Sequence, residues 1–448
     1  MMKARIGSTK ALLRGGAIFV MTAVLGGSGG IAATGETQAG AQEGTSTTPP
    51  KCDPDNGGLK LPDGFCAVVV ADKLGPTRYV AVSPTGDVYA RLRSDDDGAK
   101  GGVVALRDTD RDGRADEQQW FAKDYGTGIR FHDGYLYVST DDAVMRYQMP
   151  KGQLTPTAEP ETIVSGLLNR KQHEAKSFTF DDSGNMYVDI GAPSNACQPK
   201  DRATEVPGER PCKLLEEAGG VWRFSADRPG QTQQSGHRYS TGLRNALALA
   251  WNPEAKAVYA VPHGRDSLDT LWPDLFTAEQ NAQRTSEEFH RLEDGGDFGW
   301  PYCYYDAVDN RRLLAPEYGG DGKTVGECEK YPEPLVAFPA HWGPNDLLFY
   351  TGDQFPERYR NGAFVAFHGS WNRAPLPQAG YLVAFVPMKD GKPTGKFEVF
   401  ADGFIGKEEI KSPGDANYRP TGLAVGPDGS LYVADDVKGR IWRVVYGG

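Results

Sequence analysis

Residues 422–433, GLAVGPDGSLYV, decide the fold that we expect for this chain. An apolar strand runs into a Pro-Asp-Gly-Ser turn, and a second strand with alternating apolar side chains follows it. An Asp-Gly step supplies the positive φ of a tight hairpin turn, and period-two alternation is typical of a half-buried strand. We therefore interpret this segment as a β-hairpin.

Five segments nearer the N-terminus repeat this pattern. They are residues 81–90 (AVSPTGDVYA), 128–138 (GIRFHDGYLYV), 178–188 (FTFDDSGNMYV), 247–259 around an Asn-Pro turn, and a looser copy at 347–367. Six units at intervals of roughly 45 to 100 residues are typical of propeller blades with insertions. We predict an all-β fold, a six-bladed β-propeller of four-stranded antiparallel blades. The alternative is a two-sheet sandwich, which rarely shows such a unit repeat.

The composition of the 448 residues agrees with a large all-β protein. The chain contains 56 glycines and 31 prolines, as many short strands joined by tight turns require. Its formal net charge of −11 argues against nucleic acid or an anionic membrane as the main partner.

The N-terminal region has the features of an export signal. Four basic residues precede the apolar run 17–25, and small residues follow at 39–41. This order is typical of a secretory signal peptide, and the run is short for a bilayer span, although an uncleaved anchor remains the alternative. We predict a signal peptide at 1–41, a flexible linker at 42–58 and one catalytic propeller domain at 59–448. The protein is expected to be periplasmic or secreted, without stable membrane insertion.

The six cysteines agree with export. They fall into three sequence-local pairs, which favours three local disulfides in an oxidising compartment: Cys52 with Cys66, Cys197 with Cys212, and Cys303 with Cys328.

His173 is the first candidate for chemistry. It lies in the segment QHEAKS, just before the strand at 178–180, and in a propeller such a loop lies at the mouth of the central channel. A near-neutral imidazole suits the removal of a proton from a hydroxyl group. Taken alone, a loop histidine is usually a polar surface residue.

Three other segments could bind a ligand or a metal. Arg244 and Asn245 precede the strand at 247–253 and offer a fork for a carboxylate and an amide for oxygen contacts, although a turn arginine paired with an acidic neighbour is an equal alternative. The turn at 263–266, HGRD, can present backbone carbonyls to Ca²⁺. The segment 367–373, FHGSWNR, is dense enough in polar and aromatic side chains to indicate a binding loop.

Residues 108–116, DTDRDGRAD, match the beginning of an EF-hand-like calcium loop. Asp108, Asp110, Asp112 and Asp116 provide oxygens at positions one, three, five and nine, whereas position twelve is Gln119 and lacks the bidentate carboxylate. This segment is either a structural calcium site or a solvated acidic hairpin, and the sequence leaves both interpretations open.

In this order, the segments resemble the family of soluble glucose, aldose sugar and sorbosone dehydrogenases that depend on pyrroloquinoline quinone (PQQ). The resemblance covers roughly residues 59–445 and rests on the His173 segment, GLRN at 242–245, HGRD at 263–266, FGWP at 298–301, HGSWNR at 368–373 and RPTG at 419–422. The HGSWNR loop is most similar to the sorbosone dehydrogenase branch.

The resemblance implies a role for each matched residue. His173 matches the general base that takes the proton of the anomeric hydroxyl while hydride passes to PQQ. The backbone carbonyls of Gly264 and Arg265 match calcium ligands. The residues that match cofactor or substrate contacts are Arg244, Asn245, His368, Arg373 and Arg419.

Two departures from the family pattern bear on these roles. The well-studied glucose-oxidising members have a lysine in the region of residues 369–373 and an acidic residue at the position of Gln172. The first contact could be remade by Arg373, and the second concerns the choice of substrate.

The implied activity is the oxidation of a small sugar with PQQ and Ca²⁺, and with an external quinone or cytochrome as electron acceptor. Two other functions remain open, because propellers carry many activities. One is a calcium-dependent, lactonase-like hydrolase, which needs acidic side chains around a metal in the channel. The other is a non-catalytic propeller that binds carbohydrate or protein.

Overall fold

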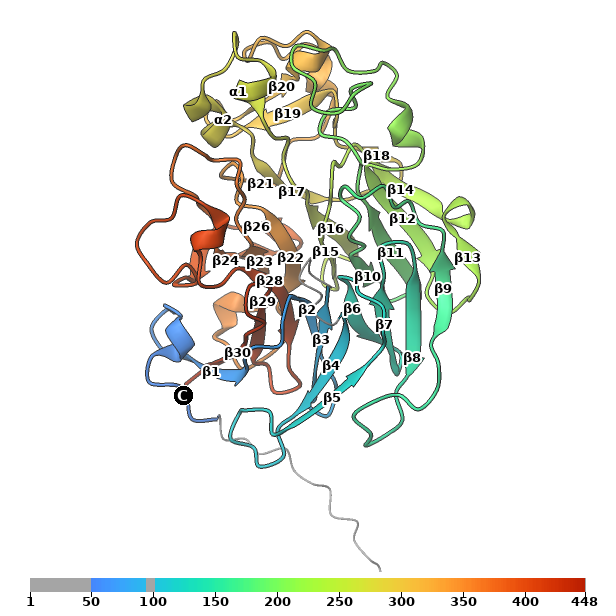
Figure 1. Ribbon diagram of the computed structural model, residues 1–448, viewed down its shortest axis with the longest axis vertical. Coiled ribbons are helices and arrows are strands. Elements are labelled where there is room, and N and C mark those ends of the chain that lie inside the picture. Colours follow the sequence, from blue (N-terminus) through green and yellow to red (C-terminus); the bar gives the residue numbers. More distant parts are fainter. Residues whose placement is uncertain (1–49, 94–100, 448) are drawn as a thin grey trace, which may run out of the picture. The chain divides into compact units, whose positions relative to one another are not determined.

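The computed structural model describes residues 50–93 and 101–447, and these residues form the predicted six-bladed β-propeller (Figure 1). Each of the six predicted hairpins forms the two inner strands of one blade. The predicted signal peptide and residues 42–49 of the predicted linker lie outside the described residues.

The first three blades follow one another along the chain. Blade 1 contains β2 (Thr77–Val82), β3 (Val88–Leu92), β4 (Gly102–Arg107) and β5 (Glu117–Phe121). Blade 2 contains β6 (Ile129–His132), β7 (Tyr135–Ser139), β8 (Val144–Gln148) and β9 (Glu161–Ser165), with β13 (Gln231–Thr232) added in parallel. Blade 3 contains β10 (Phe178–Phe180), β11 (Asn185–Ile190), β12 (Gly220–Ser225) and β14 (His237–Thr241), with β18 (Gly296–Asp297) added in parallel.

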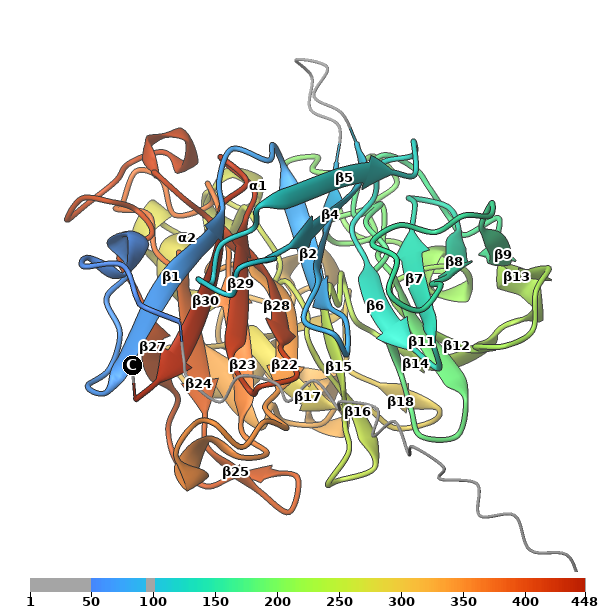
Figure 2. The same cartoon turned by 90° about the horizontal axis from the view of Figure 1, so that it is seen from below.

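The remaining blades complete the ring. Blade 4 contains β15 (Ala248–Asn252), β16 (Ala257–Val261), β17 (Glu287–Arg291) and β21 (Val336–Phe338). Blade 5 contains β22 (Pro344–Phe349), β23 (Ala363–Phe367), β24 (Leu382–Val386) and β27 (Glu398–Ala401). Blade 6 contains β28 (Pro420–Val425), β29 (Leu431–Asp435), β30 (Ile441–Tyr446) and, as its outer strand, β1 (Phe65–Ala71). The N-terminal strand β1 therefore completes the blade that the last three strands of the chain form, and Figure 2 shows β1 beside β30.

Short elements decorate the blades. Two further hairpins are β19 (Cys303–Asp306) with β20 (Arg311–Leu314) and β25 (Met388–Lys389) with β26 (Lys392–Pro393). The helices are α1 (Leu268–Leu271) and α2 (Ala278–Arg284), which lie with β19 and β20 in the extension at the top of Figure 1. Short 3₁₀ turns occur at Asn56–Gly58, Lys213–Glu216, Gln233–Ser235, Pro316–Tyr318, Gly326–Lys330, Glu357–Tyr359 and Pro413–Asp415.

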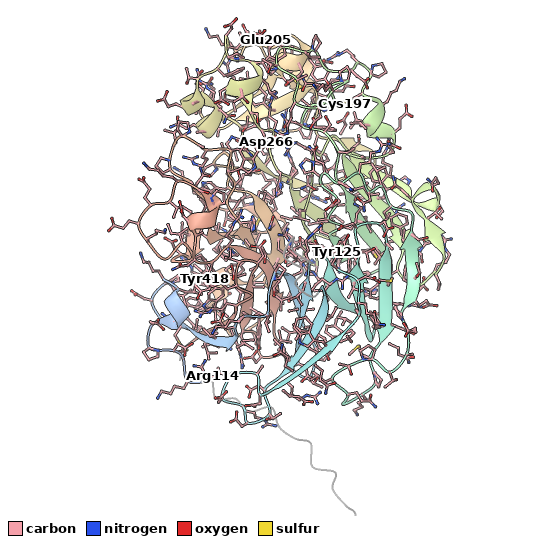
Figure 3. All side chains as sticks on the ribbon, viewed as in Figure 1. Arg114, Tyr125, Cys197, Glu205, Asp266 and Tyr418 are labelled. Carbon is pink, nitrogen blue, oxygen red and sulfur yellow. A yellow bond between two sulfur atoms is a disulfide. The ribbon has the colours of Figure 1, made fainter. Side chains whose placement is uncertain are left out.

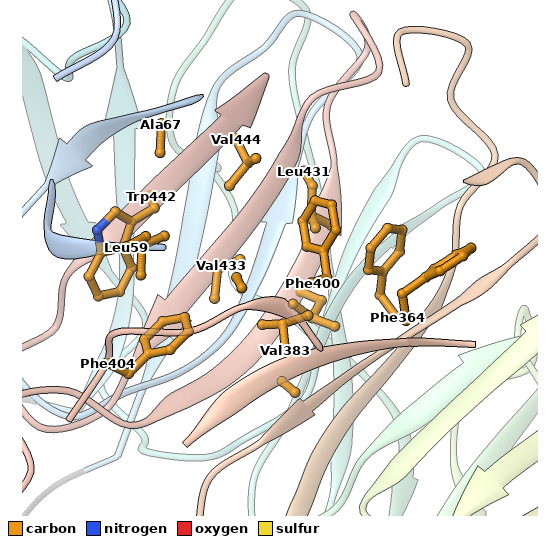
Figure 4. Close-up of a cluster of buried hydrophobic side chains, with 14 of the residues drawn as sticks. Leu59, Ala67, Phe364, Val383, Phe400, Phe404, Leu431, Val433, Trp442 and Val444 are labelled. Carbon is orange, nitrogen blue, oxygen red and sulfur yellow. The ribbon is translucent and has the colours of Figure 1, made fainter. Parts of the chain in front are cut away.

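Apolar side chains pack between neighbouring blades. The cluster in Figure 4 joins β23, β24 and β27 of blade 5 to blade 6 and includes Phe364, Phe400, Leu431, Val433 and Trp442, all nearly inaccessible to solvent. Strand β23 is buried at every position, whereas the outermost strand β5 is mostly exposed. This gradient explains why the inner hairpins were the clearest signals in the sequence.

All three predicted disulfides are present, and they pair Cys52 with Cys66, Cys197 with Cys212 and Cys303 with Cys328. The first disulfide corrects the predicted boundary between the linker and the propeller domain. Residues 50–58, predicted as the end of a flexible linker, pack against the propeller, because Cys52 is tied to β1 and Asp53 accepts the amide of Val69 at 2.8 Å. Within residues 50–93 and 101–447, the helices are too short to cross a membrane.

The topology gathers particular loops at one end of the propeller. In an antiparallel meander, the start of the first strand and the end of the second strand lie at the same edge. The loops before β10, β15 and β28 and those after β16 and β23 therefore meet at one mouth, which we call the entry mouth. The loop between β4 and β5 lies at the opposite end.

Candidate active site at the entry mouth

A polar pocket of about 730 Å³ opens at the entry mouth. Every loop that the sequence singled out as a catalytic or ligand-binding candidate, except residues 108–116 and 418–422, contributes to its wall. The lining residues are Gln172, His173, Arg202, Arg244, His263, Gly264, Asp266, Glu287, His341, Gly343, Asn345, His368, Gly369, Ser370, Trp371 and Asn372.

His173 lies in the pocket wall with one ring nitrogen fixed. Its Nδ1 lies 2.6 Å from the carbonyl oxygen of Ala192, so Nδ1 carries the proton that it donates to this acceptor. The other nitrogen, Nε2, makes no hydrogen bond with the described residues and is left as an acceptor. Burial, reinforced by the positive charge of Arg244, lowers the pKa of His173 to about 3. The imidazole is therefore neutral near pH 7.

The end of β11 approaches His173 so closely that only glycine fits there. A Cβ on Gly191 would lie 2.6 Å from the Cβ of His173 and 2.7 Å from Oδ1 of Asn245. This contact sets two predicted site residues, from the loops before β10 and β15, side by side.

Arg244 does project into the site, but it is already paired. Its guanidinium donates to Oδ2 of Asp266 at 2.5 Å and to the carbonyl of Gly264 at 2.9 Å. Arg202 donates to the same Asp266 oxygen at 2.6 Å. The two cations hold the pKa of Asp266 well below its usual range despite its burial. Arg244 therefore pairs with an acidic neighbour and also lines the pocket, so the two alternatives given for it in the sequence analysis both apply.

Asn245 and His263 form a second link between the loops. The amide nitrogen of Asn245 lies 3.3 Å from Nδ1 of His263, whose Nε2 donates to the carbonyl of Pro344 at 2.8 Å. Burial, followed by repulsion from Arg244, lowers the pKa of His263 to about 4. Oδ1 of Asn245 is buried without a hydrogen-bond partner, as are Nε of Arg244, Nδ2 of Asn345 and Oδ1 of Asn372.

The predicted calcium ligands Gly264 and Arg265 lie in the turn after β16. Gly264 lines the pocket, and Glu287 holds the turn by accepting its amide at 2.7 Å. The same carboxylate accepts the amide of Gly343 at 3.1 Å, and burial raises its pKa to about 7. The side chain of Arg265 points away into the extension, where it pairs with Glu317 at 2.5 Å. Of the two predicted calcium ligands, only Gly264 lines the pocket, and it can offer backbone atoms alone.

His368 and Arg419 form a buried network behind the pocket wall. Nε2 of His368 lies 2.8 Å from Oδ2 of Asp436, and its Nδ1 accepts from Arg419 at 2.8 Å. Arg419 also donates to the carbonyls of His368 and Gly369. His368 lines the pocket, whereas Arg419 supports the loop that carries it.

Arg373 is not among the residues that line the pocket. Its guanidinium donates to the carbonyls of Pro377, Ala282 and Ala340, so it fastens its own loop to the neighbouring segments. A direct cofactor contact by Arg373 has no support in this geometry.

The Asp108–Asp116 segment lies at the end opposite to the entry mouth. Carboxylate oxygens of Asp108, Asp110 and Asp116 lie within 4.8 Å of one another, which makes this segment a candidate metal site. Asp112 does not belong to this group, and its carboxylate accepts the amide of Arg114 at 2.8 Å. Three of the four predicted ligands are therefore brought together, far from the pocket.

Five pocket residues were not predicted as site residues from the sequence, namely Arg202, Glu287, His341, Gly343 and Asn345. Arg202 comes from the loop between Cys197 and Cys212. Figure 3 labels Cys197 and Asp266, both in the upper part of the molecule. His341 and Asn345 flank the start of β22, in a segment without a recognisable motif. Only the scarcity of histidine, with seven in the chain, could have drawn attention to His341.

The donor set of the pocket fits the cofactor that the sequence implies. PQQ carries three carboxylates and a planar quinone, so it needs fixed cations and hydrogen-bond donors. Arg202 and Arg244 are such cations, and the unpartnered buried side-chain amide atoms of Asn345 and Asn372 are available to polar ligand atoms.

The sequence is similar to that of a bacterial protein and to that of a fungal enzyme. A protein of Borreliella burgdorferi without a described activity is 24% identical over 331 residues, which cover 71% of this chain and 75% of that protein. A pyrroloquinoline quinone-dependent pyranose dehydrogenase of Coprinopsis cinerea is 30% identical over 241 residues. That match covers 47% of this chain and 31% of the enzyme.

Solved structures share the fold over most of their length. The PQQ domain of the Coprinopsis cinerea pyranose dehydrogenase, in its holo form, has a TM-score of 0.68 at 19% identity and covers 89% of this chain and 98% of the domain. The calcium structure of a Trichoderma reesei carbohydrate-active enzyme of family AA12 has a TM-score of 0.70 at 18% identity, with coverages of 87% and 97%. The PQQ-bound aldose sugar dehydrogenase of Streptomyces coelicolor has a TM-score of 0.51 at 15% identity, with coverages of 86% and 100%.

The sequence also matches the family described as TrAA12-like over residues 59–447, which is almost the whole predicted propeller domain. The chain therefore belongs to the TrAA12-like family.

Proposed function

We propose that this protein is a PQQ- and calcium-dependent dehydrogenase that oxidises an aldose or a related pyranose. The observation that carries the proposal is His173, a neutral imidazole with Nδ1 fixed and Nε2 free, in a pocket that also holds Arg202 and Arg244. The names of the relatives agree with this chemistry.

His173 acts as the general base. Its Nε2 accepts the proton of the sugar hydroxyl that is being oxidised, while the Nδ1–H bond to Ala192 keeps the ring in the required tautomer. Bound PQQ would supply the two-electron acceptor for the hydride, and Ca²⁺ would polarise it as a Lewis acid. Arg202 and Arg244 would hold carboxylates of the cofactor, and the Gly264 carbonyl proposed for the ion also accepts from Arg244.

The hydrolase alternative lacks its metal-binding carboxylates. Within residues 50–93 and 101–447, the only cluster of three or more acidic, histidine or cysteine side chains spaced for a metal is Asp108, Asp110 and Asp116, at the wrong end of the propeller. Asp266 and Glu287 in the pocket are both committed to cations or backbone amides. The pocket thus favours an anionic cofactor over a metal-bound water.

The protein is proposed to work outside the cytoplasm and to pass electrons to a separate carrier. Three disulfides support an oxidising compartment.

Replacement of His173 tests the proposal. His173→Ala is expected to reduce dye-linked sugar oxidation by roughly 10²-fold or more, the usual contribution of a general base, while PQQ affinity changes little. His132→Ala, a histidine on β6 outside the pocket, is the control and should oxidise sugar at the wild-type rate. Near-wild-type turnover of His173→Ala would reject the assignment of the base.

A further inference from the structure

Trp371 has the highest solvent exposure of any large hydrophobic side chain in the described residues, at 59%. Its ring lines the rim of the pocket at the entry mouth. Leaving an indole in water is unfavourable by the hydrophobic effect, so the chain gains nothing in stability from this placement.

The loop on the N-terminal side of Trp371 is firmly held. The amide of Gly369 donates to the carbonyl of Trp342 at 2.7 Å, and its own carbonyl accepts from Arg419 at 2.9 Å. Gly369 also has a positive φ of 76°, and a Cβ there would collide with the ring of Tyr381 at 2.2 Å.

The C-terminal side of Trp371 is held as well. Nδ2 of Asn372 donates to Asp266 at 2.7 Å, and its carbonyl accepts from Nδ2 of Asn281 at 2.8 Å. Since both neighbours are fixed, the exposed indole is presented by a rigid backbone. When a loop is fixed on both sides of an exposed aromatic side chain, we expect that side chain to contact a ligand.

We propose that Trp371 is the stacking platform for the pyranose ring of the substrate and helps to determine specificity. One face of a pyranose presents C–H groups that pack on an aromatic face, while its hydroxyl groups need polar partners. Gln172, which also lines the pocket, provides such a polar partner. This inference rests on the proposed function and adds the residue that positions the sugar.

The sugar is a better occupant for this ring than the cofactor. Arg244, a candidate cofactor contact that lines the same pocket, is only 4% exposed, whereas Trp371 is 59% exposed. The substrate enters and leaves in every turnover, so its contacts belong at the solvent side of a tightly held cofactor.

The experiment compares Trp371→Ala and Trp371→Phe with Trp120→Ala, an exposed tryptophan on β5 outside the pocket. Each protein is loaded with PQQ and Ca²⁺. Steady-state kinetics with aldoses are measured together with PQQ affinity by absorbance and binding of a methyl pyranoside by isothermal titration calorimetry. The methyl group blocks the anomeric oxygen, so this probe reports sugar binding without oxidation.

Trp371→Ala is expected to raise KM for the pyranose and to weaken methyl pyranoside binding by about tenfold each, the scale of one buried aromatic contact. PQQ affinity should stay unchanged, Trp371→Phe should restore part of the binding, and Trp120→Ala should match wild type. Weaker PQQ binding with unchanged KM would assign the ring to the cofactor and overturn the inference, as would no change in any measurement. A wild-type protein that binds PQQ but oxidises no sugar would instead reject the proposed function.

Discussion

At the scale of single residues, the site depends on how a few buried charged and polar groups pair with one another. Arg202 and Arg244 share the carboxylate of Asp266, and Asn372 donates to its second oxygen. Because Asp266 joins the loops before β12, after β16 and after β23, it is the junction of the pocket wall.

Asp266→Asn is expected to lower the free energy of unfolding by about 3 kcal/mol, since it leaves the buried Arg244 without its counter-ion. The matched control is Glu398→Gln, which removes a partner of Arg358 in a pair about half exposed on both sides and should cost less than about 1 kcal/mol. Chemical denaturation measures both. Equal losses for the two variants would mean that Asp266 is not the junction described here.

The low pKa of His173 predicts the pH dependence of the reaction. A base must be neutral to accept a proton, and with a pKa of about 3 instead of 6.5 His173 stays neutral until the solution is strongly acidic. The acid limb of the kcat/KM profile should therefore lie below pH 5. A limb near pH 6.5 would show that the imidazole is not buried as described.

The type of chemistry could be predicted from the sequence more reliably than the contacts that each side chain makes. His173, Arg244 and Asn245 were predicted because each stands directly before an inner strand. Arg373 was not distinguished from the pocket residues, since a loop arginine that binds three backbone carbonyls has the same local sequence as one that binds a ligand. Arg202 and Asp266 meet across 64 residues of chain, a distance that no local pattern encodes.

At the scale of elements, the loop between β11 and β12 becomes part of the site through its disulfide. Cys197 and Cys212 are buried in the core beside Trp300 and close a loop that carries Arg202 to the pocket. The hairpin order predicted the blades, but it could not predict which long insertion returns to the mouth.

Replacing both Cys197 and Cys212 with alanine is expected to weaken PQQ binding by about tenfold or more, because a freed loop must be ordered again when the ligand binds. Removal of the Cys52–Cys66 bridge is the matched control, since its loop spans 14 residues against 15 and ties β1 at the outer edge of blade 6. Both variants should lose about 3 kcal/mol of stability, but only the first should lose affinity. Equal PQQ affinities would remove the loop from the cofactor site.

At the scale of the whole molecule, the propeller centre is filled below the pocket. Tyr79 of β2 donates to the carbonyls of Leu247 and Asn345, and Arg130 of β6 pairs with the buried Asp346 of β22 at 2.6 Å. Side chains from different blades thus close around the centre of the propeller. The repeat in the sequence predicted six blades, whereas this closure depends on contacts between inner strands that are far apart in the chain.

The central claim is that the pocket holds PQQ with Ca²⁺ and uses them to oxidise a sugar. The most direct measurement is an absorbance titration of the purified apoprotein with PQQ, with and without Ca²⁺, followed by a panel of aldoses. The account predicts a calcium-dependent spectrum of bound cofactor that is reduced when a pyranose is added. Absence of PQQ binding at every calcium concentration would contradict it.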